Sequence, residues 1–551
     1  MKQKFLYWID NWGLFTASVF LLAFIPIYPK IPLFDILPGY IVRVRVEDIL
    51  ILGTCIFWFV QLWRKKIILK NPLTHWIGWY AVAGFAALLS GMFIVRSIPL
   101  ELLHVGKSVL HYLRYLEYFS LFFIAVSSIR SHTQVRVFVG VLLSGLSAVI
   151  LYAFGQKYLY WPVYSTMNRE FSKGIRLYLT EHARVQSTFG GHYDLAAYLV
   201  VVLPIVLALA LFSTRRWQQY GLWGLFTVGV WLITVSASRT SFAAFAVCAI
   251  LTVFLTSLHK AGWREQIRFG LSRGLLVLFL ISSNFWIFGA DIRERLLQTL
   301  EAYPTAHSTY INLSSQTEVI TQKTLALIPS SIHPKNPPNN AISTEEMEAM
   351  VASDQQPTTE KPGSPKPSDV FVEVPNLVQV ATISASGSAE VRTIEVPRTY
   401  SDAALKYGLS LAIRLDTLWP RALEGFYSDP LFGSGYATLT KDSVAHFTEA
   451  ESTDNNFLRT LGETGLFGFI TFYGAVLTSA VIGGQLAKKG IASHKPTMAT
   501  ALGIGFICAT LGLLLNAVYI DVFASSKVAF VYWSVAGLII ALWQLETRKR
   551  L

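Results

Sequence analysis

The chain has 551 residues, of which 53% are hydrophobic and 15% are charged, and its formal net charge is +12. This composition is too apolar for an ordinary soluble domain. The sequence therefore predicts a polytopic membrane protein, whose basic residues set the orientation of its loops and do not indicate nucleic-acid binding.

Apolar runs of about 17 to 25 residues are typical of membrane-spanning helices. The sequence contains such runs at 12–29, 47–63, 74–95, 106–127, 134–155, 192–212, 219–236, 240–258, 272–290, 464–485, 497–518 and 527–544. We therefore expect an all-α fold with about twelve transmembrane helices. The first nine runs define a membrane bundle over 1–290 and the last three a membrane unit over 464–551, with a large extracytoplasmic loop between helices 9 and 10.

Lys and Arg are concentrated in alternate loops. These loops carry Arg64, Lys65, Lys66, Lys70, Arg130, Arg136, Arg215, Arg216, Lys260, Arg264, Arg268, Arg273, Lys488, Lys489 and Lys495, and the chain ends with Arg548, Lys549 and Arg550. By the positive-inside rule we expect these loops and both termini to face the cytoplasm. The remaining loops, including 291–463, are then expected outside.

The predicted outer segment 291–463 is net acidic and changes composition along its length. About 303–368 is rich in Ser, Thr, Pro, Asn and Glu, which predicts disorder. About 369–396 alternates apolar and polar residues, which favours a hairpin. About 401–426 spaces its apolar residues as an amphipathic helix does, so we expect it to lie against the outer face of the bundle.

Three arginines lie in polar clusters on the predicted outer side. Arg184 precedes a glycine turn and an apolar run, Arg239 lies between two runs with almost no loop, and Arg414 is on the amphipathic segment. Each also has an ordinary interpretation: an anchor beside a helix cap, a snorkelling side chain and a solvated surface charge. The arginines are therefore candidates for anion binding, with these alternatives open.

The fourth cluster is "STDNNFLRTLGETGLFGF", residues 452–469, which opens an apolar run with Asp454, Asn455, Asn456, Arg459 and Glu463. Burying such groups in lipid without partners costs several kcal/mol each. A partner or ligand must offset this cost. His446 precedes the cluster, although a single loop histidine is more often structural than catalytic.

The four clusters together resemble the motifs of the O-antigen ligase and Wzy-type polymerase family of bacterial surface polysaccharide assembly. The matching stretches are "RVQSTFGGHYDLAAYL", the "SASR" that ends at Arg239, Arg414 with Trp419 and "AL", "FGSG", and "DNNFLRTLGETGLFG". Their order, their spacing and their common outer location carry the resemblance. One position departs from it, because Asp454 lies where many ligases have a histidine.

The resemblance implies a multi-pass glycosyltransferase of the bacterial inner membrane. Such an enzyme transfers a glycan from an undecaprenyl diphosphate carrier to a lipid or glycan acceptor on the outer side, and it needs no metal or cofactor. Arginine suits such a donor, because its planar fork matches phosphate oxygens. The implied diphosphate ligands are Arg184, Arg239 and Arg414; the candidate bases are Asp454, His446 and Glu463; Asn455, with Glu463, orients the acceptor.

Two other classes of protein fit parts of the pattern. A lipid-linked glycan transporter suits about twelve spans, but carriers usually show a repeat between halves and polar groups near the midplane of the membrane. A non-catalytic glycan-binding scaffold would use aromatic residues such as Trp419 and Tyr436 for sugar contacts. Movement of labelled substrate across vesicles and transfer of label to an acceptor distinguish these classes.

Overall fold

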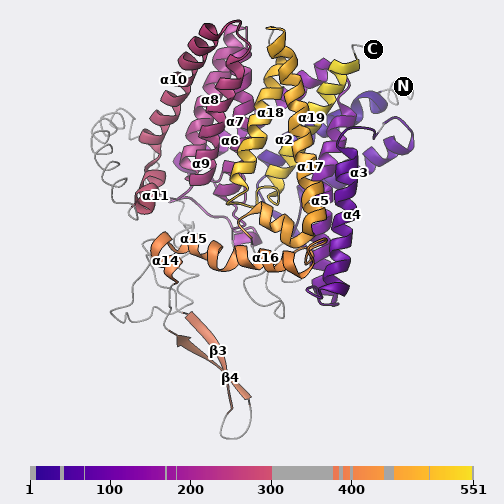
Figure 1. The fold of residues 1–551 in the computed structure, drawn as a ribbon, viewed down its shortest axis with the longest axis vertical. Helices are drawn as coiled ribbons and strands as arrows, with labels where there is room; N and C mark the ends of the chain where they lie inside the picture. Colours follow the sequence, from indigo (N-terminus) through magenta and orange to yellow (C-terminus); the bar gives the residue numbers. More distant parts are fainter. Residues whose placement is uncertain are drawn as a thin grey trace.

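The computed structural model describes residues 8–37, 43–67, 69–167, 171–180, 183–300, 376–383, 389–396, 401–439, 452–494 and 497–548. Within these ranges the chain is a bundle of long helices with two short antiparallel hairpins (Figure 1). The prediction of an all-α polytopic membrane protein is confirmed at this level. Residues 303–368, predicted to be disordered, lie outside the described part of the chain.

Eleven helical segments of the described chain are long and apolar enough to cross a membrane. They are Ile9–Ile27 (a π-helical turn and α2, Leu14–Ile27), α3 (Val46–Trp63), Thr74–Ile94 (α4, Thr74–Leu89, and a π-helical turn), α5 (Leu102–Ser128), α6 (His132–Tyr158), α7 (His192–Phe212), α9 (Arg239–Ser257), α10 (Trp263–Phe288), α17 (Asn456–Ala492), α18 (Met498–Asn516) and α19 (Ser526–Arg548).

The helix α8, Arg216–Val235, corresponds to the predicted run 219–236 but is not among these eleven segments. It is long enough, yet Gln218 and Gln219 in its first turn lower its mean hydropathy. It still packs against α7 and α10 in the bundle. A total of about twelve spans therefore stays a prediction.

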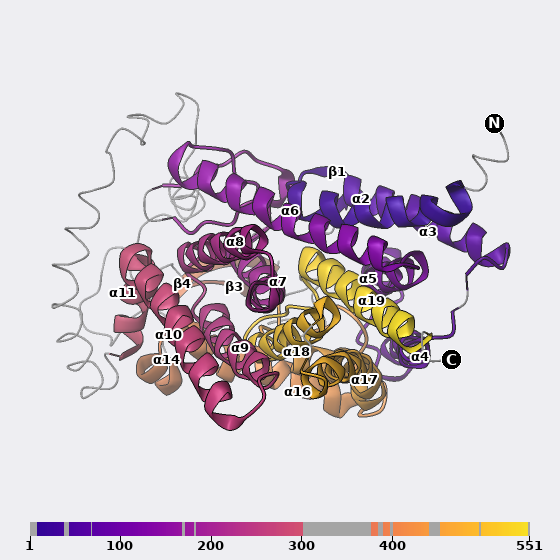
Figure 2. The same cartoon turned by 90° about the horizontal axis from the view of Figure 1, so that it is seen from above.

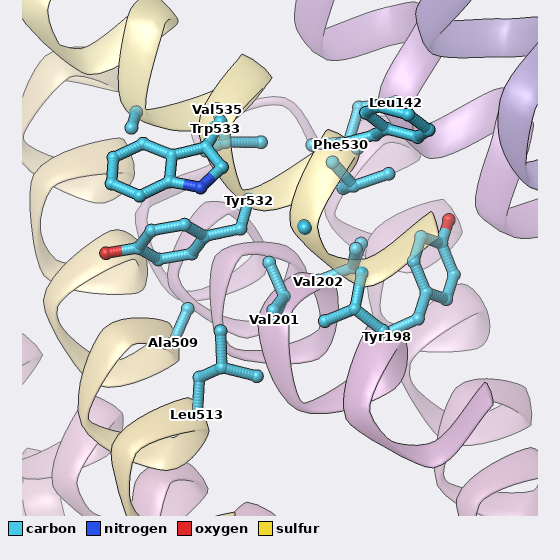
Figure 3. Close-up of a cluster of buried hydrophobic side chains, with 14 of the residues drawn as sticks. Leu142, Tyr198, Val201, Val202, Ala509, Leu513, Phe530, Tyr532, Trp533 and Val535 are labelled. Atoms are coloured by element: carbon cyan, nitrogen blue, oxygen red, sulfur yellow. The ribbon is translucent and has the colours of Figure 1, made fainter. Parts of the chain in front are cut away.

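Three helices form the centre of the bundle. Most of the apolar stretch of α7, α18 and α19 is buried, whereas α10 lies at the periphery and is largely exposed (Figure 2). Side chains such as Val201 on α7, Leu513 on α18 and Tyr532 on α19 pack together in the core (Figure 3). The central helices are apolar on nearly all sides because every face contacts another helix.

The bundle has two chemically different ends. At the basic end, which carries the loops around 64–67, 129–131, 213–215 and 258–262, Arg64 pairs with Asp10 at 2.6 Å. The loop after α17 meets the loop after α9 there, with 2.8 Å between His494 Nδ1 and the His259 carbonyl oxygen. The described chain ends at 8 and 548 lie near this end, and α16, Trp419–Ser428, crosses the opposite end (Figure 1). We call the latter the α16 end.

The segment predicted as one amphipathic helix over 401–426 is divided in the structure. It consists of α14 (Asp402–Tyr407), α15 (Leu409–Ile413), a π-helical turn (Arg414–Leu418) and α16. Gly408 separates the first two helices because its φ is 84°, a left-handed value that glycine adopts readily. Arg414, predicted to lie within one amphipathic helix, is the first residue of the π-helical turn.

The other short elements also connect the spans. The strands β1 (Pro32–Asp35) and β2 (Arg43–Arg45) pair ahead of α3, and α11 (Ala290–Leu300) follows α10. The strands β3 (Asn376–Ile383) and β4 (Ala389–Val396) form an antiparallel hairpin within the range 369–396. A short helical turn at Phe171–Lys173 lies in the loop between α6 and α7.

Candidate functional site

The "FGSG" stretch and the "GETG" stretch bind each other through their backbones. The Ser434 N–H donates to the Gly462 carbonyl oxygen at 2.9 Å, and the Gly435 N–H donates to the Glu463 carbonyl oxygen at 3.0 Å. Two motifs that the sequence places far apart therefore form one joint, which attaches the segment after α16 to the first turns of α17.

Gly465 interrupts α17 within this joint. Its φ is 62°, and a Cβ atom there would lie 2.4 Å from the Leu431 carbonyl oxygen, so a larger residue does not fit. The amides freed by the break are satisfied, because Leu466 and Phe467 donate to the carbonyl oxygens of Pro430 and Leu431 at 2.9 and 3.1 Å. The helix consequently begins at Asn456, ahead of the apolar run 464–485, and its first turns carry the polar residues.

Asp521, in the loop between α18 and α19, holds the segment that precedes α17. Its carboxylate accepts hydrogen bonds from Ser452 Oγ at 2.9 Å, from the N–H groups of Thr453 and Asn455 at 2.9 and 3.1 Å, and from Arg459 Nη1 at 3.0 Å. These four bonds position both the backbone beside Asp454 and the guanidinium of Arg459.

Asp454 is paired with Arg414. The distance between Arg414 Nη2 and Asp454 Oδ2 is 2.8 Å, and Ser452 Oγ, whose single hydroxyl proton is shared between Asp454 and Asp521, lies 2.8 Å from Asp454 Oδ1. Asp454 has a left-handed φ of 52°. Burial raises the pKa of its carboxyl above the ordinary value, and the positive charge of Arg414 opposes that rise. The structure thus brings a predicted diphosphate ligand and a predicted base into direct contact.

Glu463 and Asn455 both hold the start of α17. Glu463 Oε2 lies 3.4 Å from Arg459 Nε, and Glu463 Oε1 accepts a hydrogen bond from the Ala437 N–H at 3.0 Å. Asn455 caps the helix by accepting from the Leu458 N–H at 3.0 Å. Both residues therefore belong to the same continuous network as Asp454, Glu463 through its side chain and Arg459, and Asn455 through its backbone N–H and Asp521.

Arg184 and Arg239 lie on neighbouring segments at the α16 end. Arg184 Nη1 is 2.6 Å from His192 Nε2, at the first residue of α7. The Val185 N–H donates to the Val235 carbonyl oxygen, so this segment runs beside the short turn that leads to Arg239. Arg239 opens α9 with an exposed side chain.

A cavity of about 300 Å³ opens into the bundle at the α16 end. Its walls contain four cationic side chains, Lys30, Arg45, Arg114 and Arg459, and one carboxylate, Asp194. The other lining residues are Leu110, His111, Tyr115, Tyr118, Thr166, Ser452, Ala524, Ser525 and Ser526. The cavity is therefore suited to an anion.

Acidic neighbours orient some of the cationic side chains. Arg114 Nη1 lies 2.5 Å from Asp48 Oδ1 and 2.8 Å from Glu117 Oε2. Arg459 is held by Asp521 at 3.0 Å. Because an arginine carries five N–H donors, such a pair leaves donors for a ligand.

Lys30 differs from the arginines because its ammonium donates to a neutral group, Ser526 Oγ, at 2.9 Å. Burial, followed by the nearby positive charge of Arg45, lowers the pKa of Lys30 to about 8. The Ser525 hydroxyl, also at this wall, is buried and has no hydrogen-bond partner. An anion would stabilise the charged form of Lys30 and give this hydroxyl an acceptor.

Lys527 holds two of the cavity walls together. Its buried ammonium donates to the carbonyl oxygens of Tyr28 at 2.6 Å and Thr188 at 2.8 Å, and it lies 4.8 Å from the centre of the Phe189 ring. These contacts join the start of α19 to the loop after α2 and to the turn before α7. Lys30 is carried on that first loop, so its position depends on them.

The site residues predicted from the sequence and the residues that line the cavity overlap only in part. None of Arg184, Arg239 and Arg414, all within the described chain, is among the lining residues, whereas Arg459 and Ser452 of the fourth cluster are. His446 lies outside the described residues. The sequence interpretation missed Lys30, Arg45, Arg114 and Asp521, and it gave no role to Arg459, although this residue lies in the fourth cluster. The sequence did contain a signal for Arg114. This arginine belongs to a set of polar and charged residues at helical spacing inside an apolar run, and such residues within a membrane span often have a function: Lys107, His111, Arg114 and Glu117.

In the described part of the chain, no group of three or more His, Cys, Asp or Glu residues is arranged to hold a metal ion. No protein-family model matches this sequence, and no curated protein matches it significantly.

Proposed function

We propose that the chain is a membrane glycosyltransferase of the O-antigen ligase or polymerase type, which takes a glycan from an undecaprenyl-diphosphate-linked donor. One observation carries this proposal: four cationic side chains line a cavity of about 300 Å³ next to the Asp454 network. A diphosphate presents several anionic oxygens, and arginine forks bind such oxygens in pairs.

The proposed roles follow from the contacts of each residue. Lys30, Arg114 and Arg459 hold the diphosphate, because their charged groups line the cavity. Arg414 controls the protonation of Asp454 across their 2.8 Å ion pair. Arg184 and Arg239 lie at the same end of the bundle and stay predicted contacts of the donor.

In the proposed reaction, the acceptor hydroxyl oxygen forms a bond to the anomeric carbon of the donor sugar. The bond from that carbon to the diphosphate oxygen breaks, and the diphosphate leaves with the electron pair. The hydroxyl proton passes to the carboxylate of Asp454. Cationic groups stabilise the charge that accumulates on the leaving diphosphate.

Asp454 suits the role of base better than Glu463. Its side chain is 33% exposed and so can be reached by an acceptor, whereas that of Glu463 is 4% exposed. Burial also raises the pKa of the Asp454 carboxyl, and a base is most effective when its pKa approaches the working pH, although this property alone does not distinguish the two carboxylates. His446 stays a predicted alternative.

The same proposal places the protein in the bacterial inner membrane with its basic end in the cytoplasm. The cavity then opens on the outer side, where lipid-linked glycans are assembled into surface polysaccharide. The acceptor is a lipid or another glycan. The support is the concentration of Lys and Arg at one end of the bundle and the position of the cavity at the other.

Purified protein in lipid vesicles tests the proposal. A donor with a labelled glycan on undecaprenyl diphosphate is added together with a lipid-linked acceptor. We expect label on the acceptor and release of undecaprenyl diphosphate, both lost with Asp454→Asn and kept with Arg421→Ala, which removes an exposed charge on α16. Label that crosses the bilayer while still attached to its carrier would instead indicate a transporter, and binding without transfer or transport a scaffold.

A further inference from the structure

Two tyrosines and an arginine form a group on the loop between α6 and α7. The Arg176 guanidinium interacts electrostatically with the side chains of Tyr164 and Tyr178. Arg176 is exposed, and the tyrosines are partly exposed. We call these three residues the Tyr–Arg–Tyr group.

The backbone explains why these side chains share one face. Val163 and Leu177 form an antiparallel bridge, with 2.7 and 3.0 Å between their backbone donors and acceptors, and both side chains are buried. Because side chains alternate along extended backbone, Tyr164 and Arg176 point to the opposite, outward face, and so does Tyr178. The buried pair beneath them holds together the two backbone segments that carry the group.

The group lies beside the cavity of about 300 Å³ at the α16 end. Thr166 lines the cavity, and it is two residues along the same extended segment from Tyr164. Residues two apart on extended backbone are about 6.5 to 7 Å apart and face the same way. The Thr166 N–H donates to the Gly190 carbonyl oxygen at 2.8 Å, which holds this segment against the turn before α7.

The charge of this loop points to an anionic ligand. Between 156 and 191 the sequence contains the five basic residues Lys157, Arg169, Lys173, Arg176 and Arg184, and the two acidic residues Glu170 and Glu181. Short loops on the outer side of a membrane are usually poor in Lys and Arg. An excess of positive charge here is therefore unexpected for topology alone and agrees with a binding role.

We propose that the Tyr–Arg–Tyr group is a subsite for an acidic sugar of the glycan, one that carries a carboxylate. The tyrosine rings offer apolar faces to the C–H groups of a sugar ring. The two tyrosine side chains flank the guanidinium, and its N–H donors form a charge-assisted pair with the carboxylate. This inference rests on the proposed function, because it assigns the sugar next to the diphosphate site.

Binding to the full-length protein in detergent tests the subsite directly. The probes are a galacturonate oligosaccharide and a neutral galactose oligosaccharide of the same length, each titrated by calorimetry. We expect the acidic probe to bind about tenfold more tightly or better, because a charge-assisted hydrogen-bond pair distinguishes them. Arg176→Ala should abolish this preference, and Arg176→Lys should restore it only in part, because lysine lacks the fork.

Lys173→Ala is the matched control, since it removes one exposed positive charge from the same loop and leaves the three residues of the group unchanged. It should keep the preference for the acidic probe. A second variant, Tyr164→Phe with Tyr178→Phe, keeps the rings and removes the oxygens that interact with Arg176, so it should weaken the preference. Equal binding of both probes to the native protein, or an unchanged preference in Arg176→Ala, would overturn the proposal.

The binding assay and the transfer assay separate the two proposals. If the acidic preference is present but no glycan is transferred, the subsite holds and the proposed function fails. If transfer occurs and Arg176→Ala changes neither binding nor KM, the function holds and the subsite fails. When both hold, a rise in KM for the donor or for the acceptor in Arg176→Ala shows which substrate carries the acidic sugar.

Discussion

Arg414 and Asp454 form an ion pair with 2.8 Å between Nη2 and Oδ2, although they belong to two segments for which the sequence predicts different roles. The pair joins the π-helical turn before α16 to the segment before α17. Through Ser452 and Asp521 it continues to Arg459 and so to the wall of the cavity. A substitution at Arg414 should therefore act directly on the carboxylate of Asp454, and on the donor site only through the intervening residues.

The pH dependence of transfer tests this coupling. If Asp454 is the base, activity falls as the pH drops below its pKa, because the protonated carboxyl cannot accept a proton. Arg414 holds that pKa down against the effect of burial. Arg414→Gln should therefore move the rising limb of the pH–rate profile to higher pH. An unshifted limb in this variant would show that another group is the base.

The same pKa shift has a consequence for stability. The pKa of Asp454 is raised in the folded protein, so its contribution to stability is fully present below the unfolded pKa and is lost as the pH rises through the folded pKa. Asp454→Asn should remove this part of the pH dependence. Thermal unfolding in detergent at several pH values, compared between the native protein and this variant, measures the effect.

Lys30→Met tests the cavity as an anion site. Lys30 has a neutral partner, Ser526, and its pKa is lowered to about 8 by burial. Removing this buried charge should leave Tm unchanged or raise it, because the desolvation of a buried ammonium is relieved and the hydrogen-bond partner that is lost, Ser526, is neutral. It should weaken inhibition by inorganic pyrophosphate about tenfold or more, since one charge-assisted contact is lost.

Lys70→Met provides the control for this experiment, because Lys70 is exposed in a loop of the basic end. It should leave pyrophosphate inhibition unchanged. Equal inhibition of native protein and Lys30→Met would mean that the cavity does not bind the diphosphate.

Gly465→Ala tests the joint between the two glycine motifs. The new methyl group would lie 2.4 Å from the Leu431 carbonyl oxygen, and φ is 62°, so we expect a loss of more than about 1 kcal/mol in stability. Gly78→Ala on α4 is the control, because its Cβ meets nothing within 4 Å. That change should be neutral or stabilise the helix by up to about 1 kcal/mol. Tm values of both variants decide whether the strain is specific to Gly465.

Single cysteines test the orientation of the bundle. Lys173, in the loop between α6 and α7, and Lys70, at the basic end, are both exposed. In a background without the native cysteines, Lys173→Cys should react with an impermeant maleimide in intact spheroplasts, and Lys70→Cys should react after permeabilisation. The reverse pattern would invert the proposed topology.

Much of the fold could be predicted because spanning helices depend on local properties. The predicted run 192–212 coincides with α7, and the short connection before Arg239 is present as predicted. The start of α17 was placed too late, since its first turns are polar and pack against the "FGSG" segment and Asp521 instead of lipid. A polar helix that is buried by tertiary contacts has no apolar run to identify it.

The sequence by itself determined a polytopic membrane bundle, since a bilayer requires apolar runs of sufficient length whose backbone hydrogen bonds are satisfied within each helix. It also determined which loops are basic and where the polar clusters lie. The cavity was decided by the tertiary structure, because Lys30, Arg114 and Arg459 come from elements far apart in the chain and converge only when α5, α17 and α19 pack. The pairing of Arg414 with Asp454 was decided in the same way, because ion pairs follow distances in space and not spacing along the chain.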